Sequence, residues 1–276
     1  MKRWLINGSA AGVLAPDDRG LAYGDGLFET IAVRDGACRF LDDHLQRLAA
    51  GCERLQIPYP GDASLRADIN ALGECLYGTL KIIVTRGCGP RGYAMPTSEV
   101  INVTRIVGLF PTDNATAGID SVRVRYCATV LGRNPLLAGI KTLNRLEQVM
   151  ARAEWDEPGI YEGLMSTDQG NVVCGTMSNL FLVHNGQLIT PQLTECGIHG
   201  IMRAQVLKFA NEIGIQVNQS KLTKADIRAA DDVFLSNSQL GILPVDELEG
   251  QRYARSEITL RLKQVLAANG VAECAC

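Results

Sequence analysis

The chain has 276 residues, with 27 Lys and Arg against 30 Asp and Glu, so its formal charge is −3, and 46% of the residues are hydrophobic. This length corresponds to about two domains and is sufficient to bury a sizeable core. The composition excludes a disordered or coiled-coil chain, and the absence of a basic excess argues against a nucleic-acid binder.

The opening residues and the cysteines predict a cytoplasmic protein. Residues 1–8 (MKRWLING) contain no apolar run long enough for a signal peptide or a membrane span. The nine cysteines are scattered without a C-x-x-C pair, which favours reduced thiols over a disulfide framework. With only three histidines in the chain, no metal site is expected, and catalysis should rest on another group.

The first 110 residues carry strand and helix signals in turn. Strands are indicated by β-rich runs, helices by apolar residues spaced three and four apart, and breaks by proline and glycine. The expected elements are a strand at 4–8, a strand at 29–33 before an Asp-Gly hairpin turn, a helix from His44 to Pro58, a helix at 65–76, and strands at 80–85 and 100–109.

The rest of the chain gives a second set of elements after a polar stretch, 111–118, which is the best linker candidate. The expected elements are a strand at 121–126, a helix capped by Asn144 and Glu147, a hairpin of 180–183 with 187–190, a helix at 201–213, a strand at 232–236 and a helix at 256–268. The pattern predicts two α+β domains, residues 1–110 and 119–276, joined by the linker.

Lys141 is a candidate for covalent chemistry. It lies between a glycine-bearing loop and a helix start, in residues 138–144 (AGIKTLN). An apolar flank can lower the pKa of an amine by desolvation, as a Schiff-base lysine requires. The alternative is a solvated surface lysine.

Two segments of the second half could bind an anion. Residues 197–203 (GIHGIMR) lead directly into a helix, where free N–H groups suit a phosphate, although a flexible turn is the plainer interpretation. Residues 236–239 (SNSQ) follow an apolar strand and offer hydroxyl and amide groups, or form a simple turn.

Three arginines in the first half allow two interpretations each. Arg47 could bind a ligand or pair with Asp43 on the helix surface. Arg86 and Arg91, in the glycine-rich loop 86–93, could clamp carboxylates or belong to an exposed basic loop. Thr30 alternates with Glu29 on a strand, so one of the two side chains must face inward.

Taken together, these segments resemble the fold-type IV family of pyridoxal-phosphate enzymes over residues 5–245. Residues 18–30 (DRGLAYGDGLFET) resemble the opening motif of the family, and residues 44–48 (HLQRL) resemble its phosphate-binding arginine segment. Residues 131–135 (LGRNP) and 139–148 (GIKTLNRLEQ) are more similar to the lyase members of the family than to the aminotransferases, and residues 85–93 (TRGCGPRGY) support the same branch.

The resemblance implies a role for each matching residue. Lys141 would bind pyridoxal 5'-phosphate covalently and later move protons, and Thr30 would help to protonate a departing enolpyruvate. The phosphate would be bound by Arg47, by the backbone N–H groups of Ile201 and Met202, and by Asn237 and Ser238. Tyr23, Arg86, Arg91 and Tyr93 would contact the substrate.

The implied fold is a two-domain α+β fold of the D-amino acid aminotransferase type with a cofactor cleft between the domains. The implied function is a lyase that converts 4-amino-4-deoxychorismate to 4-aminobenzoate and pyruvate for folate synthesis, as a cytoplasmic homodimer. The alternatives are an aminotransferase of the same fold, acting on D-amino or branched-chain amino acids, and a relative that only binds the cofactor.

One position departs from the family. In residues 170–181 (GNVVCGTMSNLF), Cys174 occupies the position of a glutamate that pairs with the pyridine nitrogen of the cofactor. A thiol is a weak partner for that nitrogen, so the electron sink would be poorer. An elimination that ends in an aromatic ring tolerates this better than a transamination does, which favours the lyase.

Overall fold

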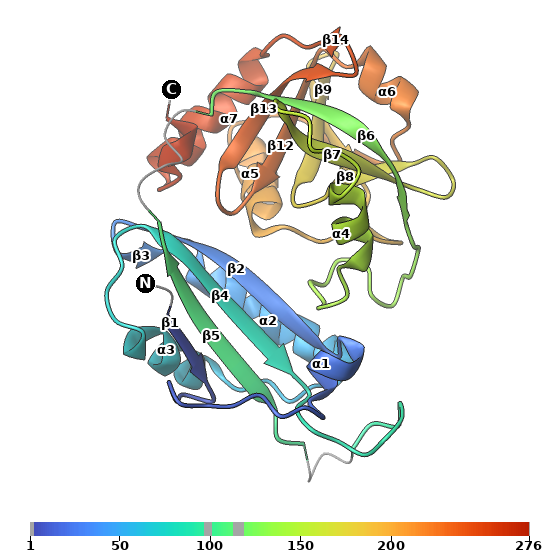
Figure 1. Cartoon of the computed structure of the whole chain (residues 1–276). Coiled ribbons are helices and arrows are strands. Elements are labelled where there is room, and N and C mark those ends of the chain that lie inside the picture. The colour runs from blue at the N-terminus through green and yellow to red at the C-terminus, as the bar shows by residue number, and fades with distance from the viewer. Residues whose placement is uncertain (1–2, 97–100, 113–118, 276) are drawn as a thin grey trace. The chain divides into compact units, whose positions relative to one another are not determined.

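The computed structural model describes residues 3–96, 101–112 and 119–275. Its contacts divide the chain into two compact units, an N-terminal unit of Met1–Ala115 with Ile140–Asn144 and a C-terminal unit of Thr116–Gly139 with Arg145–Cys276 (Figure 1). Segment 140–144, which the sequence placed in the second domain, belongs to the first because it pairs with a strand there. Of the expected linker, Pro111 ends a strand, and residues 113–118 lie outside the described residues.

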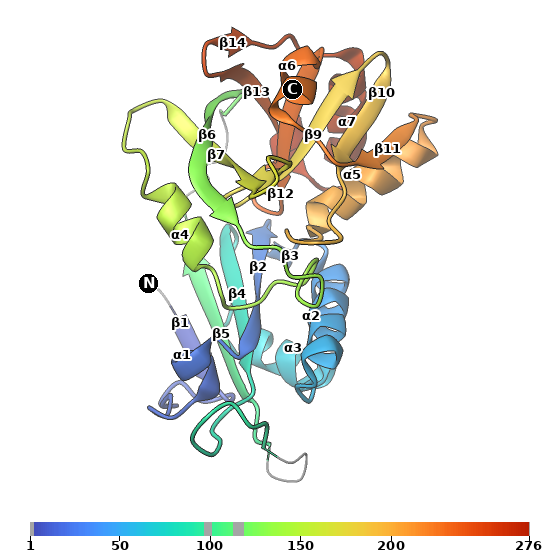
Figure 2. The same ribbon diagram turned by 90° about the vertical axis from the view of Figure 1, so that its right-hand side faces the viewer.

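Within the described residues, the N-terminal unit is a five-stranded antiparallel sheet of order β1-β5-β4-β2-β3. Helices α2 and α3 lie on the same face of this sheet (Figures 1 and 2). The elements are β1 (Arg3–Ile6), α1 (Arg19–Tyr23), β2 (Gly26–Arg34), β3 (Ala37–Cys38), α2 (Leu41–Leu55), α3 (Asp62–Ala71), β4 (Gly78–Thr85) and β5 (Thr104–Pro111).

The two faces of β2 differ in burial, as expected for a strand packed on one side. Leu27 and Ile31 are buried on the face that α2 covers, whereas Phe28 and Thr30 point to the opposite face and are half-buried. Gly51 lets α2 approach closely, because a Cβ there would lie 3.0 Å from Leu27 Cδ1. The packing of β2 against α2 thereby fixes which residues of β2 face inward.

Helix α1 and the end of α3 differ from the sequence expectation. Residues 19–23 form a single helical turn between the two expected strands 4–8 and 29–33, where no helix was expected, because the Asp18 carboxylate accepts a hydrogen bond from Gly20 N and Gly24 closes the turn at φ 68°. Helix α3 ends at Ala71 rather than near residue 76, since Gly73 adopts φ 76° and turns the chain.

The C-terminal unit, over its described residues, has a nine-stranded sheet of order β11-β10-β9-β12-β13-β6-β7-β8, with β14 on β13. A further β8–β9 pairing closes β9-β12-β13-β6-β7-β8 into a ring. The elements are β6 (Val122–Leu131), α4 (Leu146–Arg152), β7 (Ile160–Thr167), β8 (Val172–Gly175), β9 (Asn179–His184), β10 (Gln187–Pro191), α5 (Ile201–Glu212), β11 (Val217–Ser220), α6 (Lys224–Ala229), β12 (Asp232–Asn237), β13 (Gly241–Leu248), β14 (Gln251–Arg252) and α7 (Glu257–Ala268). Aliphatic side chains from these strands form the core.

The expected cap of α4 is wrong. The helix begins at Leu146 after Arg145; the Asn144 side chain donates to Gly24 O, and Glu147 accepts from Gly132 N. Both side chains of the expected capping pair therefore form hydrogen bonds with residues outside the helix.

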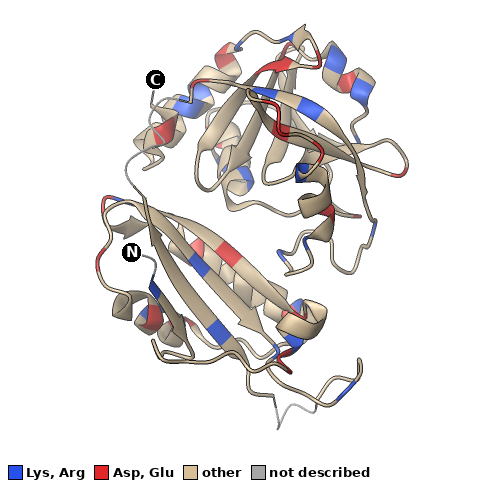
Figure 3. Ribbon diagram, viewed as in Figure 1, with Lys and Arg blue, Asp and Glu red and all other residues tan. Residues whose placement is uncertain are grey.

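Charged side chains are interspersed over the described parts of both units rather than gathered by sign (Figure 3). None of the described helices has the length and apolar character needed to cross a membrane. The described residues also contain no group of three or more His, Cys, Asp or Glu side chains placed to hold a metal ion.

Candidate active site

Lys141 is held against the start of β2 by backbone pairing. Its carbonyl accepts from Phe28 N at 3.0 Å, and Leu143 N donates to Gly26 O at 3.0 Å, around a Leu27–Thr142 bridge. Gly26 permits this approach, because a Cβ there would lie 2.8 Å from Leu143 Cδ1 and 2.5 Å from Val84 O. Segment 140–144 therefore acts as a short extra strand beside β2, which fixes the position of the lysine backbone.

The Lys141 amine lies on the half-buried face of β2. Its Nζ is 4.2 Å from the centroid of the Phe28 ring, and Lys81 Nζ is 5.3 Å from the same ring. Thr30 is two residues beyond Phe28 and pairs with Lys81 across β4. The structure thus brings the two residues expected to be catalytic, Lys141 and Thr30, to one face of one strand.

Glu29 is the residue of the alternating pair that faces inward, and it is only 1% exposed. Its carboxylate accepts hydrogen bonds from Arg47, from Nε at 2.8 Å and from Nη2, and it lies 2.6 Å from Nδ1 of the buried His44. Arg47 therefore forms an ion pair with the buried Glu29. Sequence reasoning missed Glu29 and His44 as members of the site, although the alternation along β2 required one inward-facing polar residue.

The His44 imidazole is neutral, so its close contact with Glu29 is a hydrogen bond rather than an ion pair. Burial lowers the pKa of His44 below 6.5, against the opposing effect of Glu29, and Arg47 and Lys141 lower it further. The buried Nε2 has no hydrogen-bond partner among the described residues, as suits an unprotonated nitrogen. Although burial opposes it, hydrogen bonds from His44 and Arg47 hold the pKa of the Glu29 carboxyl below 4.5.

We expect acid destabilisation to depend on His44. As the pH falls below about 6.5, the imidazole of His44 binds a proton in the unfolded state but stays neutral in the folded state. The free energy of unfolding therefore falls by up to about 1.4 kcal/mol per pH unit. Urea unfolding of His44→Gln between pH 7 and 5 should show a shallower pH slope than the wild type. His184→Gln, at a partly exposed histidine, is the control and should retain the wild-type slope. Equal slopes for His44→Gln and the wild type would contradict the neutral assignment.

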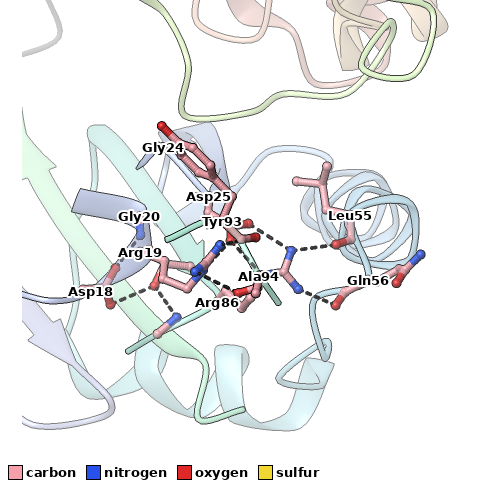
Figure 4. A network of polar contacts seen from close by, with 12 residues as sticks. Asp18, Arg19, Gly20, Gly24, Asp25, Leu55, Gln56, Arg86, Tyr93 and Ala94 are labelled. Carbon is pink, nitrogen blue, oxygen red and sulfur yellow. Dashed lines mark hydrogen bonds and ion pairs between the residues drawn. The ribbon is translucent and has the colours of Figure 1, made fainter. Parts of the chain in front are cut away.

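Arg86 is buried and bound by its own chain. Its Nε and Nη2 donate to the two Asp25 oxygens at 2.7 and 3.0 Å, and Nη1 and Nη2 donate to the carbonyls of Gln56 and Leu55 at the end of α2 (Figure 4). The expectation of an exposed basic loop is wrong for Arg86, whose exposure is 2%. Arg86 does clamp a carboxylate, but the carboxylate is Asp25, so we leave Arg86 out of the substrate site.

Tyr23 and Tyr93 are adjacent although 70 residues separate them in the chain. Their ring centroids lie 5.3 Å apart with an interplanar angle of 59°. Tyr23 is 39% exposed and Tyr93 is 84% exposed, and Arg91 beside them is also exposed. Three of the four residues expected to contact substrate therefore lie at the surface of the N-terminal unit, available to a ligand.

In the C-terminal unit, α5 begins without a side-chain cap. The N-cap residue is Gly200, which has no side-chain acceptor for the first N–H groups, those of Ile201 and Met202. A Cβ at position 200 would lie 2.0 Å from Asn179 Oδ1, so the position requires glycine. This helix start is chemically suited to an anion.

Asn237 is the last residue of β12, one residue beyond the expected strand end, and Ser238 follows it. Asn237 Oδ1 accepts from the backbone N–H groups of Gln239 and Leu240, both at 3.0 Å, so its oxygen closes a turn. Ser238 is half-buried within that turn. Of the two interpretations of residues 236–239, the Asn237 oxygen therefore fits the simple turn.

Cys174 is buried in β8 opposite Met165, within an apolar cluster that includes Cys127, Cys196 and Trp155. Burial raises the pKa of its thiol far above the usual value, and the neighbouring cysteines and Glu162 raise it further. The nearby Glu162 carboxylate accepts from the backbone N–H groups of Thr176 and Met177 and from the hydroxyls of Thr176 and Ser178. Cys174 is thus a protonated thiol, and Glu162 is used to hold the 176–178 turn.

Comparison with known proteins assigns the chain to a family. The family model described as "Amino-transferase class IV" matches residues 26–248. The chain belongs to the class IV aminotransferase family. This confirms the fold-type IV resemblance, and members of this enzyme family use pyridoxal 5'-phosphate.

The individual relatives are named either as lyases or as aminotransferases. A crystal structure of 4-amino-4-deoxychorismate lyase from Pseudomonas aeruginosa shares 45% identity, has a TM-score of 0.89, and is matched over 97% of this chain and 99% of that one. An aminodeoxychorismate lyase of Vibrio harveyi is 36% identical, over 87% of this chain and 89% of the relative. A putative branched-chain-amino-acid aminotransferase of Methanocaldococcus jannaschii is 35% identical, over 90% and 88%.

Each unit of this class IV chain, taken by itself, carries groups whose chemistry suits the cofactor. Pyridoxal phosphate needs an amine for its aldehyde, and Lys141 supplies one beside Phe28. Its phosphate needs N–H donors or cations: within the C-terminal unit the start of α5 offers N–H donors, and within the N-terminal unit Arg47 offers a cation. At position 174, where the family resemblance implies a glutamate for the ring nitrogen, the buried thiol of Cys174 offers no charge.

Proposed function

We propose that the protein is a lyase that converts 4-amino-4-deoxychorismate to 4-aminobenzoate and pyruvate, and that it serves folate synthesis. The observation that carries this proposal is the 45% identity, over nearly the whole of both chains, to a protein named for that reaction. The position of the Lys141 amine over Phe28, on the face of β2 that also carries Thr30, supports it. We also propose that the protein is a cytoplasmic homodimer. Analytical ultracentrifugation would measure the mass of the assembly.

Each residue has a proposed role. Lys141 binds the cofactor through its amine, Arg47 binds the phosphate, and the N–H groups of Ile201 and Met202 with Asn237 and Ser238 are further phosphate ligands. When bound, pyridoxal phosphate supplies a conjugated ring that delocalises negative charge from the amine-bearing carbon of the substrate.

Proton transfers fall to this chain's side chains. The Lys141 amine takes the proton from the amine-bearing ring carbon, the neighbouring C–O bond breaks and the ring becomes aromatic. The Thr30 hydroxyl gives its proton to the departing enolpyruvate, which becomes pyruvate. Tyr23 and Tyr93 contact the substrate ring, and Arg91 binds a substrate carboxylate.

An aminotransferase of D-amino or branched-chain amino acids is the second candidate, favoured by the 35% identity to a relative with an aminotransferase name. Incubation with enzymatically generated aminodeoxychorismate separates the two. A lyase forms 4-aminobenzoate and pyruvate without any keto-acid acceptor, whereas an aminotransferase consumes an acceptor in equal amount. Failure to form 4-aminobenzoate would overturn the lyase proposal.

Cys174→Glu should shift the balance between these activities. A carboxylate at this position can pair with the pyridine nitrogen and strengthen the electron sink, on which transamination depends more than an aromatising elimination does. We expect the ratio of the transamination rate to the lyase rate to rise at least about threefold, measured with D-alanine and with aminodeoxychorismate. Cys174→Gln, which adds similar bulk without charge, is the matched control. An unchanged ratio in Cys174→Glu would remove the basis of this argument.

A further inference from the structure

The Asp25 carboxylate lies between two arginines near the surface of the N-terminal unit. Arg19 Nε donates to Asp25 Oδ2 at 2.9 Å, and Arg86 Nε donates to the same oxygen at 2.7 Å (Figure 4). Burial opposes ionisation, but hydrogen bonds from Arg86 and Arg19 hold the pKa of Asp25 below its usual value. Because Arg86 is also tied to the end of α2, Asp25 gives Arg19 a rigid anchor.

The other side of the Arg19 guanidinium holds a loop without regular structure. Nη1 donates to the carbonyls of Gly92 and Ala94 at 3.0 and 3.3 Å, and Nη2 approaches the Tyr93 carbonyl at 3.5 Å. Arg19 is only 4% exposed, so these hydrogen bonds are shielded from water. One buried side chain thus fixes three consecutive carbonyls of an otherwise exposed loop.

Arg19 also orients the aromatic pair. Its Cζ lies 5.0 Å from the centroid of the Tyr23 ring, and that ring contacts Tyr93. A planar guanidinium can stack on a ring while its N–H groups donate in the ring plane, which an ammonium cannot do. The positions of both tyrosines therefore depend on the same side chain.

We propose that Arg19 is a positioning residue for substrate recognition: through Asp25 it holds the 92–94 loop and the Tyr23–Tyr93 pair in place to receive a cyclic carboxylate substrate. This rests on the proposed function for the identity of the substrate. Arg19 need not touch the substrate, since its donors are directed to Asp25 and to the loop carbonyls. Its effect is on binding rather than on the proton transfers at Lys141.

Steady-state kinetics of Arg19→Lys test the proposal. Lysine keeps a positive charge near Asp25 but cannot form the fork to the loop, so KM for aminodeoxychorismate should rise about tenfold while kcat stays within about threefold. Tyr93→Ala should raise KM similarly, and the double variant should be no worse than the worse single variant, because both changes remove the same feature. Arg105→Lys, which alters an ion pair with Asp68 in the same unit, is the control and should leave KM unchanged.

A second readout is independent of the reaction. Trypsin should cut after the exposed Arg91 several-fold faster in Arg19→Lys than in the wild type or in Arg105→Lys, because the released loop fits the protease more easily. Arg19→Gln, which can still donate to Asp25, serves if Arg19→Lys does not fold.

The two readouts separate the possible failures. If the wild type has no lyase activity, the proposed function fails and the rate of tryptic cleavage alone decides whether Arg19 anchors the loop. Three results would each overturn the positioning role. They are an unchanged KM in an active Arg19→Lys enzyme, a KM increase in the double variant equal to the product of the two single increases, and an unchanged rate of tryptic cleavage in Arg19→Lys.

Discussion

Replacing Lys141 with alanine should abolish catalysis. The amine is both the proposed covalent attachment point of pyridoxal phosphate and the proposed general base, so kcat for 4-aminobenzoate formation should fall by at least about 10⁴-fold. The visible absorbance of lysine-bound cofactor should disappear with it. Absorbance after dialysis against excess pyridoxal phosphate, followed by a pyruvate assay, measures both effects.

The structure supplies a matched control for this experiment. Lys81 Nζ lies over the same Phe28 ring as Lys141 Nζ, at 5.3 Å against 4.2 Å. Lys81→Ala should retain the lysine-bound absorbance, since its backbone belongs to β4 and not to the 140–144 segment. An active Lys141→Ala protein, or a loss of the absorbance in Lys81→Ala alone, would transfer the covalent role away from Lys141.

Glu29→Gln should have the largest effect on stability. The substitution is nearly isosteric, but it removes the negative charge that faces the Arg47 guanidinium, whose side chain is 13% exposed, and it weakens the hydrogen bond of His44. Breaking a buried ion pair in this way costs about 3–5 kcal/mol of the free energy of unfolding. The urea midpoint at pH 7 measures the loss.

The same variant should bind pyridoxal phosphate more weakly. Glu29 orients Arg47 through two hydrogen bonds, and Arg47 is a proposed phosphate ligand. Glu53→Gln, an exposed position on the same helix, is the control and should change stability by less than about 0.5 kcal/mol and leave cofactor affinity unchanged. The central role given to the Glu29 carboxylate is wrong if Glu29→Gln and Glu53→Gln have the same urea midpoint.

Local sequence signals predicted an element correctly where neighbouring residues along the chain determine its structure. The helix from His44 and the strand before Asp35-Gly36 follow from apolar spacing and turn chemistry, and α2 and β2 confirm them. The family resemblance, carried by motifs spread along the chain, is confirmed by the class IV match. The match does not assign the site residues, whose roles stay proposals.

Local sequence signals gave a wrong prediction where a residue distant in the sequence determines the contacts of a side chain. Asn144 and Glu147 have the spacing of a capping pair, yet Gly24 O and Gly132 N take their side chains. Arg86 follows β4 in a glycine-rich stretch typical of an exposed loop, yet Asp25 and the end of α2 enclose it. In each case the competing partner is more than ten residues away, and spacing along the sequence carries no information about it.

The sequence by itself determined the fold family and the near-neutral charge, and it singled out the lysine on which the proposed chemistry depends, because motifs and composition are properties of the chain. Only the tertiary structure decided that Glu29 rather than Thr30 faces inward, that Lys141 belongs to the N-terminal unit, and that Arg86 is buried and bound to Asp25. The physical reason is that burial and ion pairing arise from segments that meet only in the folded state. Cys174 follows the same division: the family resemblance implies a glutamate at its position, and the fold shows that its thiol is buried, which keeps it protonated.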